Sequence, residues 1–243
     1  FVPMLTENLG EHIVLRTLRT DKFKSDYLSV SFKQPLDRRE AAMNALILRI
    51  LKRGTENYPD MIALSKKLDS LYSADIFTDA RCLGETQMLN FSLDALSNDY
   101  ALDDTDILTE GAKLLAEIIY SPVTENGAFN QAYFESEKRN QLADIDAEIN
   151  NKAKYALSRL RTLMFAHERY GASALGTREE VEALTNAELY AHYRKLLTSS
   201  AMNIIYVGNA DEEKLHAALA PILSGYHPGE VVRSTTEVVR RSS

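Results

Sequence analysis

Apolar and polar residues alternate in several short segments of the chain, and longer segments between them follow the period of a helix. The segment 26–33 places Leu28, Val30 and Phe32 on one side and two serines on the other. This is the pattern of a strand that is buried on one face. The same kind of pattern predicts further strands over residues 12–19, 74–81, 86–95 and 201–208.

Helical periodicity is clearest over residues 40–52, which are apolar nearly all round and are therefore expected in the interior. Asp60 is suited to cap a second helix, whose apolar face includes Ile62. Thr177 begins a capping-box sequence. The pattern predicts further helices over 104–120, 177–197 and 211–222. It also predicts a long helix that begins near residue 129 and bends near Asn150-Asn151. In the bent helix, Ile149 is assigned to the apolar face.

The predicted order, β-β-α-α-β-β-α-α-α-β-α, lacks the strict alternation of a parallel sheet. Strand hairpins and segregated helices instead predict an α+β fold, with a largely antiparallel sheet of about five or six strands packed against helices. We expect residues 1–226 to form a single domain. Residues 227–243 combine β-branched residues with charges, and we expect a C-terminal linker or an extra strand there.

Composition narrows the classes of function. A net charge of −7 argues against a nucleic-acid partner, and no apolar run approaches the roughly 20 residues that cross a bilayer. The N-terminal residues lack the pattern of a signal peptide. Cys82 is the only cysteine, which excludes an internal disulfide and a thiolate-cluster metal site. A cytoplasmic location without membrane contact is therefore expected.

The segment 44–59 carries the most informative pattern: an apolar helix runs into Gly54-Thr55 and is followed by Tyr58-Pro59. It resembles the active-site helix of the pitrilysin/insulinase family of zinc peptidases. The segments 68–76, 134–145 and 202–209 also resemble that family, so the likeness covers about residues 10–226. It implies a metallopeptidase-like α+β domain corresponding to an N-terminal half, closest to the zinc-free YfmF-like members.

In this family, His-x-x-Glu-His stands at a fixed distance before the Gly-Thr pair. The two histidines and a distant glutamate hold zinc, and the central glutamate is the general base. The resemblance places Ala45, Leu48 and Arg49 at the three motif positions. Asp144 falls at the distant ligand position, and Glu137 matches the first of two glutamates on that helix. The resemblance therefore implies no catalytic residue, no metal ligand set and no zinc cofactor.

Arg49 and Asp144 come close together in the family fold, which motivates the hypothesis that they form an ion pair in place of the metal. The alternative is that Asp144 is an ordinary solvated residue of its helix, because carboxylates usually face water.

In active relatives, a peptide substrate adds as a strand to the edge strand that follows the second helix. By resemblance that strand contains Asp75, Ile76, Phe77 and Thr78, which are candidate peptide-binding residues. Backbone pairing of this kind needs no catalytic group. The alternative is that the strand only completes the sheet.

These observations favour a degenerate, non-catalytic family member that forms a structural or peptide-binding half of a peptidase assembly. The expected partner is a second family domain or a zinc-bearing sister subunit in a heterodimer, and peptide is a further candidate. Two alternatives stay open. One is a protein-interaction scaffold unrelated to proteolysis, and the other is an active zinc-dependent peptidase with atypical ligands.

Overall fold

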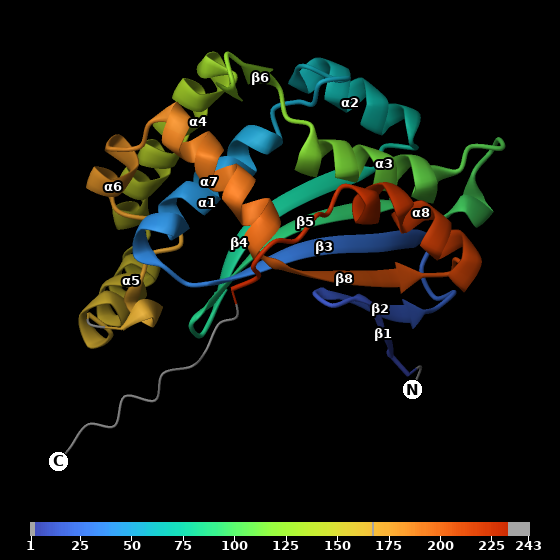
Figure 1. Cartoon of the computed structure of the whole chain (residues 1–243), viewed down its shortest axis with the longest axis horizontal. Helices are drawn as coiled ribbons and strands as arrows, with labels where there is room; N and C mark the ends of the chain where they lie inside the picture. Colours follow the sequence, from blue (N-terminus) through green and yellow to red (C-terminus); the bar gives the residue numbers. More distant parts are fainter. Residues whose placement is uncertain (1–2, 167, 233–243) are drawn as a thin grey trace.

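A computed structural model describes residues 3–166 and 168–232 of the chain. Within these residues, a six-stranded mixed sheet has the order β1-β2-β8-β3-β5-β4 (Figure 1). Its strands are β1 (Leu5–Gly10), β2 (Ile13–Arg19), β3 (Ser25–Pro35), β4 (Asp75–Leu83), β5 (Thr86–Leu96) and β8 (Ala201–Gly208). β2 and β8 run parallel, and the other neighbours are antiparallel. The predicted α+β class with a largely antiparallel sheet is confirmed.

β3 lies inside the sheet, between β5 and β8. Its alternating sequence explains why one face of the sheet can be covered: Leu28, Val30 and Phe32 are fully buried in the hydrophobic core. Ser29 and Ser31 lie on the opposite face. β8 comes last in sequence among the described strands, yet in the sheet it lies between β2 and β3 and pairs with both.

The helices gather mainly on one face of the sheet, and α5 lies at one end of that layer (Figure 1). They are α1 (Arg38–Leu51), α2 (Met61–Ser70), α3 (Ile107–Tyr120), α4 (Gln131–Ala147), α5 (Lys152–Met164), α6 (Arg178–Glu182), α7 (Asn186–Ser199) and α8 (Glu212–Ser224). Asp60 and Thr177 cap α2 and α6 as predicted. In the part of the chain described, no helix is both long and apolar enough to cross a membrane.

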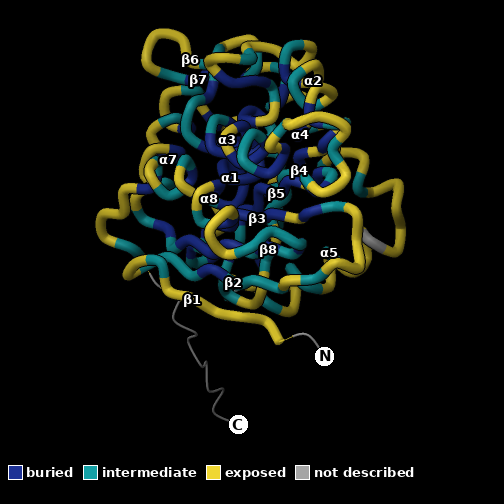
Figure 2. Tube along the Cα trace, turned by 90° about the vertical axis from the view of Figure 1, so that its right-hand side faces the viewer, coloured by how far each residue is buried: buried dark blue, intermediate teal, exposed yellow. Residues whose placement is uncertain are grey.

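α1 is the central helix of the core, in agreement with its apolar sequence. Asp37 begins it by accepting hydrogen bonds from the N–H groups of Arg39 and Glu40. Nearly every residue from Ala41 to Leu51 is buried, and Figure 2 shows α1 within the buried interior. The faces of α1 are covered by the sheet on one side and by neighbouring helices on the others, so its side chains are placed rigidly.

A buried polar network ties α1 to β5 and α7. Asn44 donates from Nδ2 to Oε1 of Gln87 over 2.7 Å, and its Oδ1 lies 2.8 Å from Nε2 of His192. Burial lowers the pKa of His192, because the charged imidazolium would lose its hydration. The network therefore favours the neutral imidazole.

Some expectations were wrong in detail. β1 was not predicted, because its sequence does not alternate and its pairing with β2 defines it. The helix expected over 177–197 is divided, since Thr185 caps α7 separately from α6. Ile62 and Ile149, assigned to apolar faces, are 69% and 49% exposed.

Short elements complete the described chain, and one of them is the bend expected near Asn150-Asn151. The short strands β6 (Thr124–Glu125) and β7 (Ala128–Phe129) form a hairpin of their own. The short helices are η1 (Asn98–Tyr100), η2 (Glu148–Asn150) and η3 (Arg169–Gly171). η2 interrupts the helical region between α4 and α5.

The described chain ends beside α7. The N–H of Gly229 donates to the carbonyl of Thr198 over 2.8 Å, and the N–H of Val232 donates to that of Ser199 over 3.0 Å. The linker or extra strand expected over 227–243 falls partly on residues 233–243, which lie outside the described residues.

Candidate functional site

A pocket of about 430 Å³ opens between α1, α4 and β4. Ala45, Leu48 and Arg49 contribute one wall, and they share a face of α1 because they are three and four residues apart. Glu137 of α4 and Thr78 of β4 line other sides. The pocket therefore brings together three parts that are far apart in sequence: the altered motif, the distant-ligand helix and the edge strand.

The α1 wall is chemically inert at two of its three positions. Ala45 and Leu48 are 6% and 3% exposed, and their side chains consist of carbon and hydrogen alone. Neither side chain has a lone pair for a metal ion, and neither can accept a proton from water.

Arg49 forms the ion pair raised as a hypothesis above. Its Nη2 lies 2.6 Å from Oδ2 of Asp144, and the two side chains are 27% and 55% exposed. Asp144 is thus both paired and partly solvated. These groups do not fit a zinc ion, because a permanently charged guanidinium repels a cation and already occupies the carboxylate.

A second ion pair, between Arg53 and Glu137, lines the pocket. Nη1 of Arg53 is 3.2 Å from Oε1 of Glu137, whose side chain is only 9% exposed. Asn140 donates to the other carboxylate oxygen over 3.2 Å, and the guanidinium stacks over the ring of Tyr133. Both carboxylate oxygens of Glu137 therefore already have side-chain partners.

The Gly-Thr turn after α1 has a structural role. A Cβ on Gly54 would lie 2.7 Å from backbone atoms of Tyr58 and Pro59, so only glycine fits without movement. The N–H of Thr55 donates to the carbonyl of Tyr58 over 2.8 Å, and its hydroxyl donates to Glu117 over 3.2 Å. The turn thereby fixes the end of α1 against α3.

β4 lies at an edge of the six-stranded sheet, next to the pocket. Of the candidate peptide-binding residues, Ile76 is buried in the core, while Asp75 and Phe77 are exposed. The hydroxyl of Thr78 makes a long, 3.5 Å hydrogen bond to the carbonyl of Leu48. The edge thus presents backbone groups and an aromatic side chain to solvent.

Cys82, near the other end of β4, is half-buried. Burial raises the pKa of its thiol, although the charge of Arg161 acts in the opposite direction. A thiol that stays protonated is a poor nucleophile, so the chemistry of this residue is that of a small packing group.

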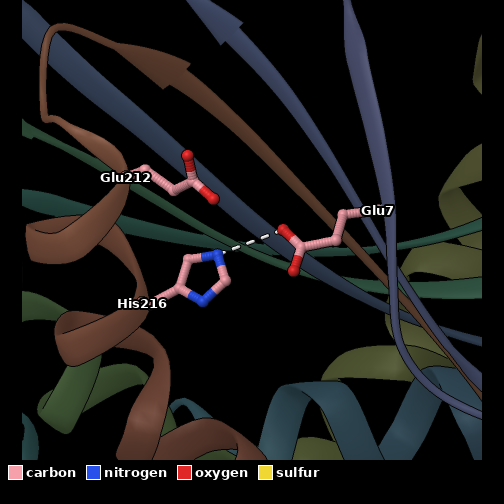
Figure 3. A group of neighbouring side chains, drawn as sticks. All are labelled: Glu7, Glu212 and His216. Atoms are coloured by element: carbon pink, nitrogen blue, oxygen red, sulfur yellow. Dashed lines mark hydrogen bonds and ion pairs between the residues drawn. The ribbon is translucent and has the colours of Figure 1, made fainter.

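A group of possible metal ligands that sequence reasoning missed lies at the opposite edge of the sheet (Figure 3). Glu7 of β1 faces His216 of α8, with Nε2 of the imidazole 3.1 Å from a carboxylate oxygen, and Glu212 lies nearby. Among the described residues, these three offer ligand atoms within 4.8 Å of one another. The four-residue spacing of Glu212 and His216 was the available signal, but 209 residues separate Glu7 from His216.

Comparison with curated proteins finds the probable inactive metalloprotease YmfF of Bacillus subtilis (strain 168). It is 30% identical over 211 residues, which are 87% of this chain and 49% of YmfF. This match confirms the expected resemblance to a zinc-free homologue of the pitrilysin/insulinase family. No protein-family model matches the chain.

Many solved structures share the fold, and two crystal structures illustrate the likeness. A conserved protein from Enterococcus faecalis V583 superposes with a TM-score of 0.88 at 27% identity, over 96% of this chain and 54% of that one. The peptidase M16 inactive domain from Pseudomonas fluorescens superposes with a TM-score of 0.77 at 18% identity, over 97% and 53%. The chain spans about half the length of these relatives.

Proposed function

Because this chain is a degenerate homologue of the pitrilysin/insulinase zinc peptidases, we propose that it acts as a non-catalytic half of a peptidase assembly. The pocket carries this proposal. Arg49 and Asp144 neutralise each other at positions that hold metal in active relatives, and Leu48 lies at the position of the base. Such a pocket keeps the place of a peptidase site without the groups that activate water.

The proposed partner is a second family domain, either in the same polypeptide or in a zinc-bearing sister subunit that forms a heterodimer with this chain. This is supported by the lengths of the relatives. The chain covers 49% of one and 54% of the other, so each relative contains a further region of similar length. In this proposal the chain is an N-terminal half, residues 1–226 form one domain, and zinc belongs to the partner.

The proposed contribution of the chain is to hold peptide or to shape one wall of a chamber. An extended peptide would pair with the free edge of β4, near Phe77 and Thr78. Phe77 is 50% exposed and offers an apolar contact beside that edge. Pairing through backbone groups tolerates many peptide sequences, as a peptidase assembly requires.

We also propose a cytoplasmic location. A chain with a single, half-buried cysteine and no disulfide suits a reducing compartment. Fractionation of the source cells tests this directly, and recovery of the chain outside the cytoplasm would contradict it.

The central experiment measures zinc content and peptide cleavage of the purified chain, with and without a chelator. We expect no zinc at the α1 pocket and no chelator-sensitive cleavage. The control is His216→Ala, because the cluster of Glu7, Glu212 and His216 is a separate place where added zinc can bind. Stoichiometric zinc in this variant, together with cleavage that a chelator abolishes, would instead establish an active peptidase with atypical ligands.

A second measurement separates the proposal from a scaffold unrelated to proteolysis. The chain is isolated from its source cells, its partners are identified by mass spectrometry, and the assembly is tested for peptidase activity. A partner domain with intact His-x-x-Glu-His and an active assembly supports the proposal. Stable partners without any peptidase-like domain would favour the scaffold.

A further inference from the structure

The apolar side of α5 faces solvent, which is the reverse of the usual arrangement. Four large apolar residues are 68%, 53%, 67% and 58% exposed, namely Leu157, Leu160, Leu163 and Met164. Their spacing places them on one stripe of the helix. Monomeric proteins rarely leave such a contiguous stripe uncovered, so a stripe of this kind marks an interaction surface.

The inward side of α5 is polar. Ser158, Arg161 and Thr162 are only partly exposed, although all three are hydrophilic. α5 packs chiefly against η2 and η3, its immediate neighbours in the chain. A helix of 13 residues is marginal in water without tertiary packing. A partner that covered the stripe would therefore bury most of the apolar surface that α5 exposes.

The surface next to the stripe is hollow. A pocket of about 440 Å³ is lined by Leu157, Leu160, Phe165 and Tyr170, among others. The rings of Phe165 and Tyr170 meet edge to face at 4.9 Å, which gives the hollow a firm wall. Concave apolar surfaces of this size accept a protruding side chain of a protein partner.

Charge describes the partner further. The segment 152–164 contains four basic residues and no acidic one, in a chain whose net charge is −7. A complementary surface is therefore apolar at its centre and acidic at its rim. A second copy of this chain fits poorly, because symmetric contact through α5 would bring two basic helices together.

A membrane surface is the other occupant that a basic amphipathic helix suggests. The geometry favours protein, because the apolar residues border a hollow. A bilayer has no side chain to fill such a hollow.

The position of α5 relates it to the candidate site. Arg38, the first residue of α1, donates to the carbonyl of Ala166 just after α5 over 2.6 Å. Ala174 and Leu175, which follow η3, line the α1 pocket. A partner seated on α5 would therefore border that pocket.

We infer that the exposed stripe of α5 is the docking surface for the second peptidase-like domain, through an apolar, acid-rimmed face of that domain. This inference rests on the proposed function. The additional region of similar length in the relatives supplies an occupant of suitable size. Docking here would place the second domain beside the pocket and the edge of β4.

The test replaces Leu160 with the photo-crosslinking residue p-benzoylphenylalanine in the natural protein, within its source cells. The control is the same replacement at Leu102, which is 92% exposed and belongs to another part of the chain. We expect crosslinked peptides from a peptidase-like domain at position 160 and not at 102. Adducts with lipid, with another copy of this chain or with an unrelated protein would overturn the inference, as would equal yields at both positions.

A second variant pair keeps the two proposals distinguishable. Leu160→Ser should lower the yield of the assembly with the second domain at least tenfold, while Leu102→Ser leaves it unchanged. Circular dichroism confirms that both variants are folded. If the assembly forms equally well with both variants, the docking inference fails and the proposed function stands. If no peptidase-like domain accompanies the unmodified protein, the proposed function itself fails.

Discussion

The ion pair of Arg49 and Asp144 can be tested by a double-mutant cycle with Arg49→Gln, Asp144→Asn and both together. If the pair replaces the charge balance of a metal site, the two residues must be energetically coupled and not merely adjacent. The chain offers a matched control in Arg39 and Glu188, which lie at the same distance of 2.6 Å. The two pairs differ mainly in exposure. The side chains of Arg39 and Glu188 are 68% and 45% exposed, whereas those of Arg49 and Asp144 are 27% and 55% exposed.

The magnitude follows from distance and exposure. Two unit charges about 4 Å apart attract by about 1 kcal/mol in water and about 4 kcal/mol at an effective dielectric constant of about 20. Because Asp144 is more than half exposed, solvent screening and side-chain entropy reduce the net coupling to about 0.5–1 kcal/mol. The control pair should give about 0–0.5 kcal/mol. Arg53 and Glu137, with the glutamate nearly buried, should give about 1.5–3 kcal/mol.

The assay is urea denaturation of each cycle, followed by fluorescence of the tyrosines and by circular dichroism, at low and high salt. Coupling in the Arg49 cycle should exceed that of the control cycle and should fall as salt rises. A coupling for Arg49 and Asp144 equal to the control value, or of opposite sign, would refute the interpretation that this pair stabilises the altered site.

Three further predictions address the site, the network and the turn. The double variant Ala45→His with Arg49→His should bind zinc through two imidazoles and the nearby carboxylate on α4, and isothermal titration should show tight binding that the unmodified pocket lacks. His192 has a lowered pKa in the folded chain, so stability should fall as the pH drops below about 6.5, where the unfolded chain binds a proton first. His192→Gln should lose that pH dependence in urea melts; an unchanged profile would assign it elsewhere. Gly54→Ala should lower the free energy of unfolding by about 1–3 kcal/mol, whereas Gly10→Ala, which has space for a methyl group, should change it by less than about 0.5 kcal/mol.

Local patterns in the sequence predicted the parts of the fold that depend on local chemistry. The alternation of β3, the apolar character of α1 and the caps at Asp60 and Thr177 each have a cause within a few residues. The same holds for the absence of donor atoms at Ala45 and Leu48, which is a property of the residue types themselves.

What the sequence could not predict depends on distant partners. β1 is defined by its pairing with β2, and its own residues show no strand periodicity. The apolar face of α5 has the pattern of a buried helix, and its exposure follows only from the tertiary arrangement. Likewise Glu7 of β1 and His216 of α8 meet although they are far apart in the sequence, and no local spacing records that contact.

The position of β8 has a consequence for synthesis of the protein on the ribosome. β2 pairs with β8 on one side and β3 pairs with it on the other, so the sheet remains in two pieces until residues 201–208 have emerged. A nascent chain would expose two unpaired strand edges until β8 is available, which is the condition under which chaperones are needed. The order of strands thus makes closure of the sheet a late step in the folding of this domain, because closure requires β8.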